Sequence, residues 1–507
     1  QGLMTSGSTH ASKPTSAVSL TGQRPRFAEI GIVFLLALLM YGATAGRDVL
    51  WGDPAKLSRF VHDQALSFGQ ESHIGHVLWS SLFTVLPVES FAWRMHLSSA
   101  ITMALALAIG YWTLAALGVG RRAAVLGIAA VAVAHTVWLN ASIHESYSLV
   151  LLVLACAARL MVARQVVLAG LVIGLGVLAH PLCLFSAPPL AFLLLTGPRR
   201  WKGVLLFGAA VAVAWLGPVF GAAFIRASQA GEGVDWFALV QEKQHYARLD
   251  YPLKNAPLLA GYWFHNVASP VLLLILVAFD SMDKRRRFAA AIMIGIHYGF
   301  ALFWMPQRSY LIVVPVYAFM AYMVARGAEH FIQRRTSMFA PLLASIVLLP
   351  VAAYVISPPV VRALNVLPPI NDLPFRDEAN YFLRPWKFDE DSARSLLTAL
   401  DGQLPQGSVL VGDWTVLSVI RYAQRVEGWR RDVHIHEDLA LSNRAGLDAV
   451  RVTEHLQKGE RVFLLDYSSA PPPALLIEAG TLKSRDKKTG LQEVIRRQPD
   501  AESPNTG

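Results

Sequence analysis

The chain has 507 residues, of which 54% are hydrophobic and only 16% charged, and its formal net charge is +10. A soluble protein of this length would carry about 25% charged residues, so the composition argues against an ordinary soluble enzyme and indicates a polytopic membrane protein. Lys and Arg in cytoplasmic loops explain the positive charge better than nucleic-acid binding does. Both cysteines, Cys156 and Cys183, lie inside apolar runs and do not predict a disulfide framework.

The N-terminal segment, residues 1–26, is rich in Ser and Thr and has no periodicity, which predicts a disordered cytoplasmic tail. The first apolar run, 27–45, exceeds the about 7–15 residues of a signal-peptide core, so we expect a membrane anchor. It ends in Ala43-Thr44-Ala45, which resembles a signal-peptidase site. A cleaved signal peptide is therefore the alternative, and the sequence leaves this choice open.

Ten more apolar runs follow, so we expect a polytopic α-helical membrane protein with about 11 transmembrane helices. Several runs are shorter than the roughly 20 residues that a perpendicular helix needs, so their boundaries are soft. The expected spans are 27–45, 93–116, 123–140, 147–163, 165–179, 182–197, 203–224, 259–280, 288–304, 309–326 and 337–357.

The distribution of Lys and Arg gives the expected orientation. Basic residues gather in alternate loops, including Arg121-Arg122, Arg199-Arg200, Lys284 to Arg287 and Arg334-Arg335. Because such loops face the cytoplasm, we expect a cytoplasmic N-terminus and a bacterial inner membrane location. The acidic and histidine-rich loops then share the periplasmic face.

The composition changes after Pro358-Pro359, since residues 360–507 are rich in charged residues and contain no run long enough to span a membrane. Residues 392–400 predict an amphipathic helix, and 408–412 and 461–466 predict buried strands. We therefore expect a small α/β periplasmic domain over 358–483, which follows the transmembrane module over 27–357. The tail from 484 to 507 is predicted to be disordered.

The first periplasmic loop, 47–92, concentrates ionisable side chains at the mouth of the membrane. Such groups are costly near a bilayer, so their clustering predicts a functional site. Asp53 stands between Gly52 and Pro54, where a turn presents its carboxylate at the start of a helix.

An activated sugar on a polyprenyl phosphate would need three things for transfer to a hydroxyl: a carboxylate base, a group that stabilises the leaving phosphate and an apolar groove. Asp53 suits the first role, and Arg308, just before an expected span, suits the second. His73, His76 and His180 are further candidates for binding.

Several segments in chain order resemble the GT-C superfamily of polyprenyl-phosphate-sugar glycosyltransferases, and most closely its protein O-mannosyltransferase-like branch. The matching segments are Trp51-Gly52-Asp53, Ser72 to Trp79, Trp93 to Ala100, Trp138 to Leu149, Gly174 to His180, Leu404 to Gly407, Gly412-Asp413 and Tyr422 to Val433. Each segment alone is weak evidence, and their common order is the stronger signal.

The resemblance implies an inverting glycosyltransferase with Asp53 as general base and Glu145 as the second acidic residue. Its partners would be a polyprenyl-phosphate-linked sugar donor, a protein or glycan acceptor and membrane lipid, without nucleic acid. No cofactor is certain and a divalent metal stays open. The expected substrate-binding residues are Asp48, His73, His76, Arg94, His144, His180, Arg308 and Tyr310.

Two other classes of protein stay open at this point. A transporter would carry ionisable groups within its spans and an internal repeat of its topology, and neither is visible here. A non-catalytic membrane subunit of a cell-envelope assembly system would not need acidic residues in both of the first two periplasmic loops.

Overall fold

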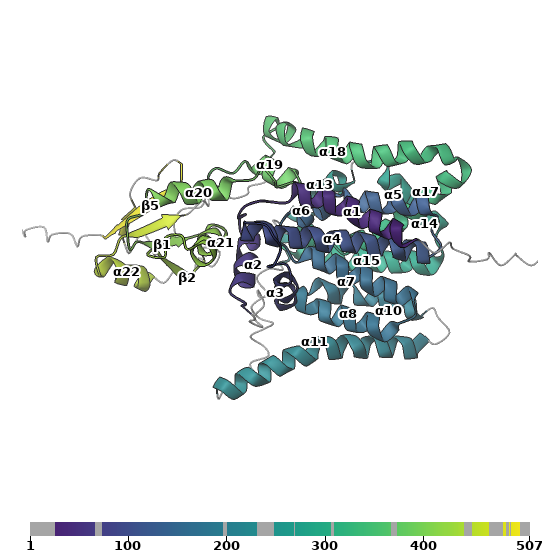
Figure 1. The fold of residues 1–507 in the computed structure, drawn as a ribbon, viewed down its shortest axis with the longest axis horizontal. Helices are drawn as coiled ribbons and strands as arrows, with labels where there is room; N and C mark the ends of the chain where they lie inside the picture. Colours follow the sequence, from purple (N-terminus) through teal and green to yellow (C-terminus); the bar gives the residue numbers. More distant parts are fainter. Residues whose placement is uncertain are drawn as a thin grey trace, which may run out of the picture.

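The computed structural model describes residues 26–65, 73–195, 200–230, 248–267, 269–305, 309–366, 373–440, 449–465, 480–482, 486 and 488–496. A bundle of apolar helices carries a small domain of helices and strands at one end (Figure 1). The helices of the bundle are α1 (Phe27–Thr44), α4 (Phe91–Ala116), α5 (Arg121–Ala132), α6 (His135–Ser142), α7 (Tyr147–Val162), α8 (Val166–Ala179), α9 (Leu182–Phe185), α10 (Ala187–Leu195), α11 (Arg200–Ala230), α13 (Tyr251–Asn266), α14 (Val271–Ser281), α15 (Lys284–Phe303), α16 (Ser309–Ile312), α17 (Val316–Arg334), η3 (Thr336–Met338) and α18 (Phe339–Ala363).

Each expected span coincides with one helix or with a pair of consecutive helices. In the described part of the chain, four helices are long and apolar enough to cross a membrane, and two bent pairs raise the number to six if each pair is one span. Other apolar helices, such as α7 and α8, are shorter. A multi-pass helical membrane protein is thus supported, and the count of eleven spans stays a prediction.

One of the bent pairs, α5 and α6, shows how the bundle tolerates a broken helix. The two helices meet at 66°. The break leaves backbone C=O and N–H groups without their partners within the helix, and side chains from other helices form hydrogen bonds with them. The hydroxyl groups of Tyr41 and Tyr354 donate to the carbonyl oxygens of Ala132 and Val133 at 2.8 and 2.7 Å, and the N–H of Thr136 donates to an Asn266 side chain at 2.7 Å. A break inside a membrane-spanning bundle requires such replacement bonds.

Small residues let the helices approach closely. A Cβ atom on Gly127 of α5 would lie 2.3 Å from the carbonyl oxygen of Ala321 in α17, and one on Gly327 of α17 would lie 1.9 Å from that of Leu274 in α14. Gly170 brings α8 equally close to α11. Helices packed in lipid gain mainly from such close van der Waals contact, because lipid is as apolar as their side chains.

The C-terminal part contains α19 (Glu378–Leu383), α20 (Ser392–Asp401), β1 (Val409–Gly412), α21 (Trp414–Tyr422), the π-helical turn η4 (Ala423–Glu427), β2 (His434–Ala440), α22 (Ala449–Gln457), β3 (Val462–Leu465), β4 (Gly480–Leu482) and β5 (Leu491–Arg496). The strands form one sheet in the order β2-β1-β3-β5-β4. β1 pairs in parallel with β2 and β3, whereas β5 is antiparallel to β3 and β4. The expected helix at 392–400 and the two expected strands coincide with α20, β1 and β3.

Two boundaries differ from expectation. The transmembrane module was expected to stop before Pro358, but α18 continues through Pro358 and Pro359 to Ala363. Proline accepts helical φ angles, but inside a helix it loses a hydrogen bond and its ring crowds the carbonyl of the residue four positions earlier, so a proline pair predicts a helix end even though α18 continues here. Within the tail expected to be disordered from 484 to 507, residues 491–496 form β5, which pairs with β3 over Leu491–Val494, whereas residues 497–507 lie outside the described part of the chain.

The first loop packs into the core of the C-terminal domain. It supplies α2 (Asp53–His62) and α3 (Ile74–Ser81), which lie at the end of the bundle nearest the sheet (Figure 1). Val49, Trp51 and Ala55 are buried in one cluster with domain residues such as Leu396 and Leu417. The indole N–H of Trp51 also donates to Ser392 Oγ at 2.7 Å. The loop therefore takes its shape from both the bundle and the domain.

Candidate active site

Asp53 is the first residue of α2, where a negative charge interacts favourably with the helix dipole. Gly52 precedes it with a φ of 73°, a backbone conformation that residues with a Cβ atom rarely adopt. The N–H of Gly52 donates to the carbonyl oxygen of Thr415 at 3.3 Å, and a Cβ atom there would lie 3.3 Å from the Trp414 ring. The turn that presents the Asp53 carboxylate is therefore held against α21 of the C-terminal domain.

Asp48 is paired with the same domain. Its two carboxylate oxygens accept hydrogen bonds from Arg394 of α20 at 2.9 and 2.7 Å, and Arg394 also binds Glu427. Burial alone would raise the pKa of Asp48, but the bonds from Arg394 and from the N–H of Val49 hold that pKa below its ordinary value. The ion pair between Asp48 and Arg394 therefore attaches the first loop to the C-terminal domain.

A buried hydrogen-bond network joins α2 to the second loop. The Ser58 hydroxyl donates to the carbonyl oxygen of Pro54 at 2.7 Å, so Ser58 Oγ accepts the N–H of His144 Nδ1 at 3.0 Å. His144 Nε2 is then the acceptor for the Ser80 hydroxyl of α3, at 3.1 Å. Asp53 adjoins Pro54 and Glu145 adjoins His144, so this network places the backbones of the two acidic residues near each other.

His96 of α4 extends the network to Asp48. Its Nδ1 accepts the backbone N–H of His144 at 2.8 Å, which leaves the proton of the neutral ring on Nε2. Nε2 donates that proton to the carbonyl oxygen of Asp48 at 3.0 Å. Through His96 the second loop is bonded to the residue that Arg394 clamps.

His76 of α3 lies against the His144 ring, with the ring centres 4.7 Å apart. The side chain is fully buried, and neither ring nitrogen has a hydrogen-bond partner within the described residues. Burial lowers the pKa of His76 to about 3, and burial also holds the pKa of His144 well below its ordinary value. Both rings are therefore neutral at physiological pH and cannot serve as cations for a phosphate.

His73 and His180 form a separate ring stack beside α3. Their centres are 5.2 Å apart with an angle of 13° between the planes, and Tyr147 packs against His180 at 4.9 Å. His73 Nδ1 contacts the carbonyl oxygen of Ala179 at 2.8 Å. Gly75 has no side chain, which lets α3 approach the end of α8 closely beside this stack. A Cβ atom at Gly75 would lie only 2.8 Å from the Ala179 nitrogen.

Glu145 is buried, and its backbone N–H donates to Ser99 Oγ at 3.3 Å. Burial raises the pKa of Tyr381, and the negative charge of Glu145 adds to that rise. Since Tyr381 belongs to α19, Glu145 lies close enough to this helix for its charge to act on Tyr381.

The other expected binding residues have different surroundings. The Arg94 guanidinium donates to the carbonyl oxygens of Val88, Thr84 and Glu89 at 2.8 to 3.2 Å, so it holds the turn that precedes α4. We therefore leave Arg94 out of the proposed site. Tyr310 is buried in α16 and stacks on Tyr262 at 4.5 Å. Arg308 lies outside the described residues.

Sequence reasoning missed Ser58, Ser80, His96 and Arg394, which connect the candidate residues. His96 carried a weak signal, because it lies within the Trp93 to Ala100 segment that matches the family pattern. The serines and Arg394 carried none. Among the described residues, no group of three or more His, Cys, Asp or Glu side chains is placed to hold a metal ion.

No protein-family model matches the chain, and no curated protein matches its sequence. Two crystal structures of ArnT from Cupriavidus metallidurans match its structure, one bound to undecaprenyl phosphate and one in the apo state. They share 12% and 13% sequence identity with this chain, each at a TM-score of 0.57. The matches cover 93% and 92% of this chain and 98% and 97% of the ArnT chains.

The chain has the fold of ArnT. At 12% and 13% identity this likeness shows the fold, a multi-pass helical architecture as the sequence predicted. Neither ArnT structure favours the O-mannosyltransferase-like branch. The match extends over nearly the whole of both chains, so the likeness to ArnT is not limited to a few helices.

Proposed function

We propose that the chain is an inner-membrane glycosyltransferase that moves a sugar from a polyprenyl-phosphate donor to a hydroxyl group on the periplasmic side. The observation that carries the proposal is Asp53 at the start of α2, bonded through Ser58 and His144 to the loop of Glu145, within an ArnT fold. One of the ArnT structures is bound to undecaprenyl phosphate, which supports a lipid phosphate as the donor's carrier.

In the proposed reaction, the Asp53 carboxylate accepts the proton of the acceptor hydroxyl as its oxygen attacks the anomeric carbon. The bond from that carbon to the phosphate oxygen breaks, and the polyprenyl phosphate leaves with the electron pair. The configuration at the sugar is inverted in this single displacement. Glu145 is the second acidic residue of the site, and its buried position suits a role in orienting a hydroxyl.

The stacked rings of His73 and His180 lead to a proposal for the hydrogen-bond donor that stabilises the leaving phosphate. His180 Nδ1 accepts the N–H of Leu182 at 3.1 Å, so the neutral His180 ring carries its proton on Nε2 and is a donor. Tyr310 and Arg308 complete the proposed donor set, Arg308 on its sequence position alone. The N–H of a neutral His73 ring donates to the Ala179 carbonyl oxygen, so His73 packs against His180 and does not donate to the phosphate. A preorganised donor is most effective where charge develops in the transition state.

The sugar and the acceptor rest on the motif resemblance alone. It favours mannose or another hexose and a protein Ser or Thr acceptor, with a glycan or lipid as the wider choice. A divalent metal is not required by the proposed chemistry.

A transfer assay with the full chain in vesicles tests the proposal. Radiolabelled polyprenyl-phosphate mannose and polyprenyl-phosphate glucose are each supplied with lipid and peptide acceptors. We expect one donor to lose its label to an acceptor with release of polyprenyl phosphate. If no donor supports transfer or binds to the protein, the proposal fails.

A further inference from the structure

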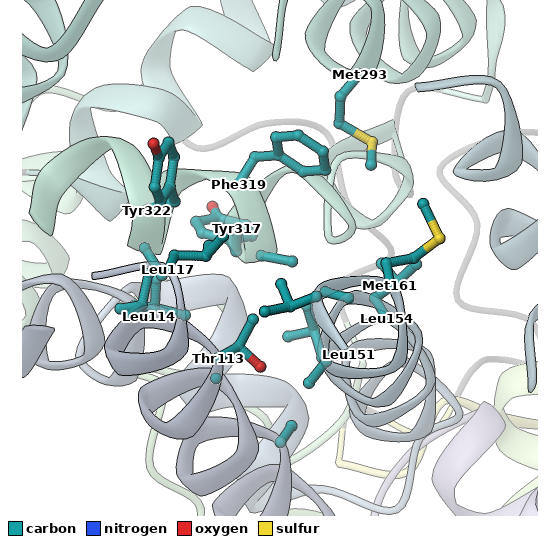
Figure 2. A pocket seen from close by; sticks show the side chains of 18 of the residues that line it. Thr113, Leu114, Leu117, Leu151, Leu154, Met161, Met293, Tyr317, Phe319 and Tyr322 are labelled. Carbon is teal, nitrogen blue, oxygen red and sulfur yellow. The ribbon is translucent and has the colours of Figure 1, made fainter. Parts of the chain in front are cut away.

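The bundle contains an apolar cavity of about 200 Å³. It is lined by residues of α4, α5, α7, α10, α15 and α17, and Figure 2 shows Leu, Met and aromatic side chains around it. Leu114, Leu151, Met293 and Phe319 are among them. Apolar cavities of this kind stay dry and accept apolar ligands. A cavity of this size has room for a short length of hydrocarbon chain.

The cavity lies away from the candidate active site. His96, which binds the Asp48 carbonyl, stands near the start of α4, whereas the cavity is lined by α4 residues from Met103 to Leu117. At a rise of 1.5 Å per residue, the lining begins about 10 Å beyond His96 and ends about 30 Å beyond it. The cavity therefore belongs to the other half of the bundle.

Among the described lining residues, Arg286 of α15 is the charged one. Its Nη1 donates to the hydroxyl of Tyr322 at 2.5 Å, and both side chains line the cavity. The Arg286 side chain is 45% exposed, so the guanidinium lies at the rim, with its Nε 3.3 Å from Asp283.

The rim has an excess of positive charge. Four exposed cations, Lys284, Arg285, Arg286 and Arg287, stand beside two exposed carboxylates, Asp280 and Asp283. The distribution of basic loops predicts that this end faces the cytoplasm, where anionic lipids attract basic residues near the membrane surface. An apolar cavity with a cationic rim complements a molecule that has a hydrocarbon chain and an anionic head.

We propose that this cavity binds an anionic phospholipid of the cytoplasmic leaflet, with part of one acyl chain inside and the phosphate on Arg286. The proposal goes beyond the transferase reaction, because a sugar donor must place its phosphate near Asp53, at the opposite end of the bundle. A lipid held here fills a space between six helices and fastens α15 to α4, α7 and α17.

Photolabelling of the full chain tests the proposal. The protein is reconstituted in phosphatidylcholine vesicles that contain phosphatidylglycerol with a diazirine in the middle of one acyl chain. We expect crosslinks on the peptides that carry Leu114, Leu154 and Met293, and competition by unlabelled phosphatidylglycerol. Equal competition by phosphatidylcholine, stronger competition by polyprenyl phosphate, or the absence of label on these peptides would overturn the proposal.

Variants separate the head-group and chain contacts. Arg286→Gln removes the charged hydrogen-bond donors that would bind the lipid phosphate directly, and such a bond is stronger than the attraction of a nearby surface charge, so the labelling should fall about tenfold. Lys284→Gln is the matched control, since it removes a neighbouring charge that does not line the cavity, and should keep most of the labelling. Ala158→Phe, which fills the cavity from α7, should lower the labelling while the charge is kept. Equal losses in Arg286→Gln and Lys284→Gln would reduce the effect to general surface charge and contradict a specific site.

Discussion

Arg394 binds both carboxylate oxygens of Asp48 although the two residues are 346 positions apart in the chain. Asp48 lies five residues before Asp53, and Arg394 belongs to the C-terminal domain. The domain is thus attached to the loop that carries the proposed base, by a bidentate ion pair of the kind that fixes geometry as well as adding energy.

The first prediction concerns this ion pair. Arg394→Ala should lower the free energy of unfolding and reduce transfer, because the first loop loses its attachment to α20. Both partners are about one-third exposed, so a double-mutant cycle with Asp48→Asn should give a coupling of only about 1 kcal/mol. The cycle is measured by denaturant unfolding in detergent.

The Arg461–Glu493 pair on the sheet is the control for this cycle. Arg461→Ala should leave transfer unchanged, because this pair joins β3 and β5 at the sheet and not the first loop. A loss of transfer as large as that of Arg394→Ala would show that any damage to the domain suffices, and the clamp would lose its special role.

The second prediction concerns Gly52. Gly52→Ala should cost about 1–3 kcal/mol of stability and lower transfer, because alanine is strained at a φ of 73° and its Cβ meets the Trp414 ring. Gly402→Ala is the matched control, since Gly402 has a φ of −81° and open space around it. Thermal unfolding and transfer rates are compared in both variants. Equal behaviour of the two variants would refute the strained turn.

The third prediction concerns the bond between Ser58 and His144. Ser58→Ala removes the hydroxyl that accepts the buried Nδ1–H of His144, which should cost about 1–3 kcal/mol. The double variant with His144→Phe should lose less than the sum of the two single losses, because it removes both polar groups. Ser418→Ala serves as control, since the Ser418 hydroxyl donates to the Trp414 carbonyl oxygen of its own helix. Additive losses would contradict the bond.

The fourth prediction concerns pH and Lys387, which is buried between the bundle and the domain, with its backbone N–H on the Thr44 carbonyl at 2.8 Å. Burial lowers the pKa of Lys387 to about 7. Between this pKa and the ordinary value of about 10.4, the unfolded chain holds the proton and the folded chain does not, so stability should rise with pH. Below pH 7 both states are protonated and the cost of burial is present in full.

Lys387→Met removes this cost, so its stabilising effect should be largest below pH 7 and should decline as the pH rises towards 10. Exposed Lys458→Met should show no such dependence. Thermal unfolding across this pH range makes the comparison. A Lys387→Met effect that is constant with pH would contradict the buried, shifted lysine.

Much of the helical architecture could be predicted, because apolar runs and basic loops report on the local environment of each segment. Gly52-Asp53-Pro54 likewise predicted a turn and a helix start, and α2 begins at Asp53. Both are properties of neighbouring residues, which a sequence displays directly.

The long-range pairs could not be predicted in the same way. Arg394 is an ordinary residue of an amphipathic helix, and nothing near it in the sequence indicates Asp48 as its partner. The break between α5 and α6 at Val133 and Ala134 has no Pro or Gly, and it depends on the distant Tyr41, Tyr354 and Asn266 side chains. The strand β5 was missed because Gln492 and Glu493 make it polar, and its pairing with β3 comes from tertiary context.

The most direct measurement of the central claim is the transfer rate of Asp53→Asn relative to Asp63→Asn. Asparagine keeps the shape of the side chain but cannot accept the proton, so transfer should fall by at least about 10²-fold while donor binding and unfolding temperature are kept. Asp63 ends the same helix and pairs with exposed Arg425, so Asp63→Asn should retain near-normal transfer. Near-normal transfer by Asp53→Asn would contradict the assignment of Asp53 as the base.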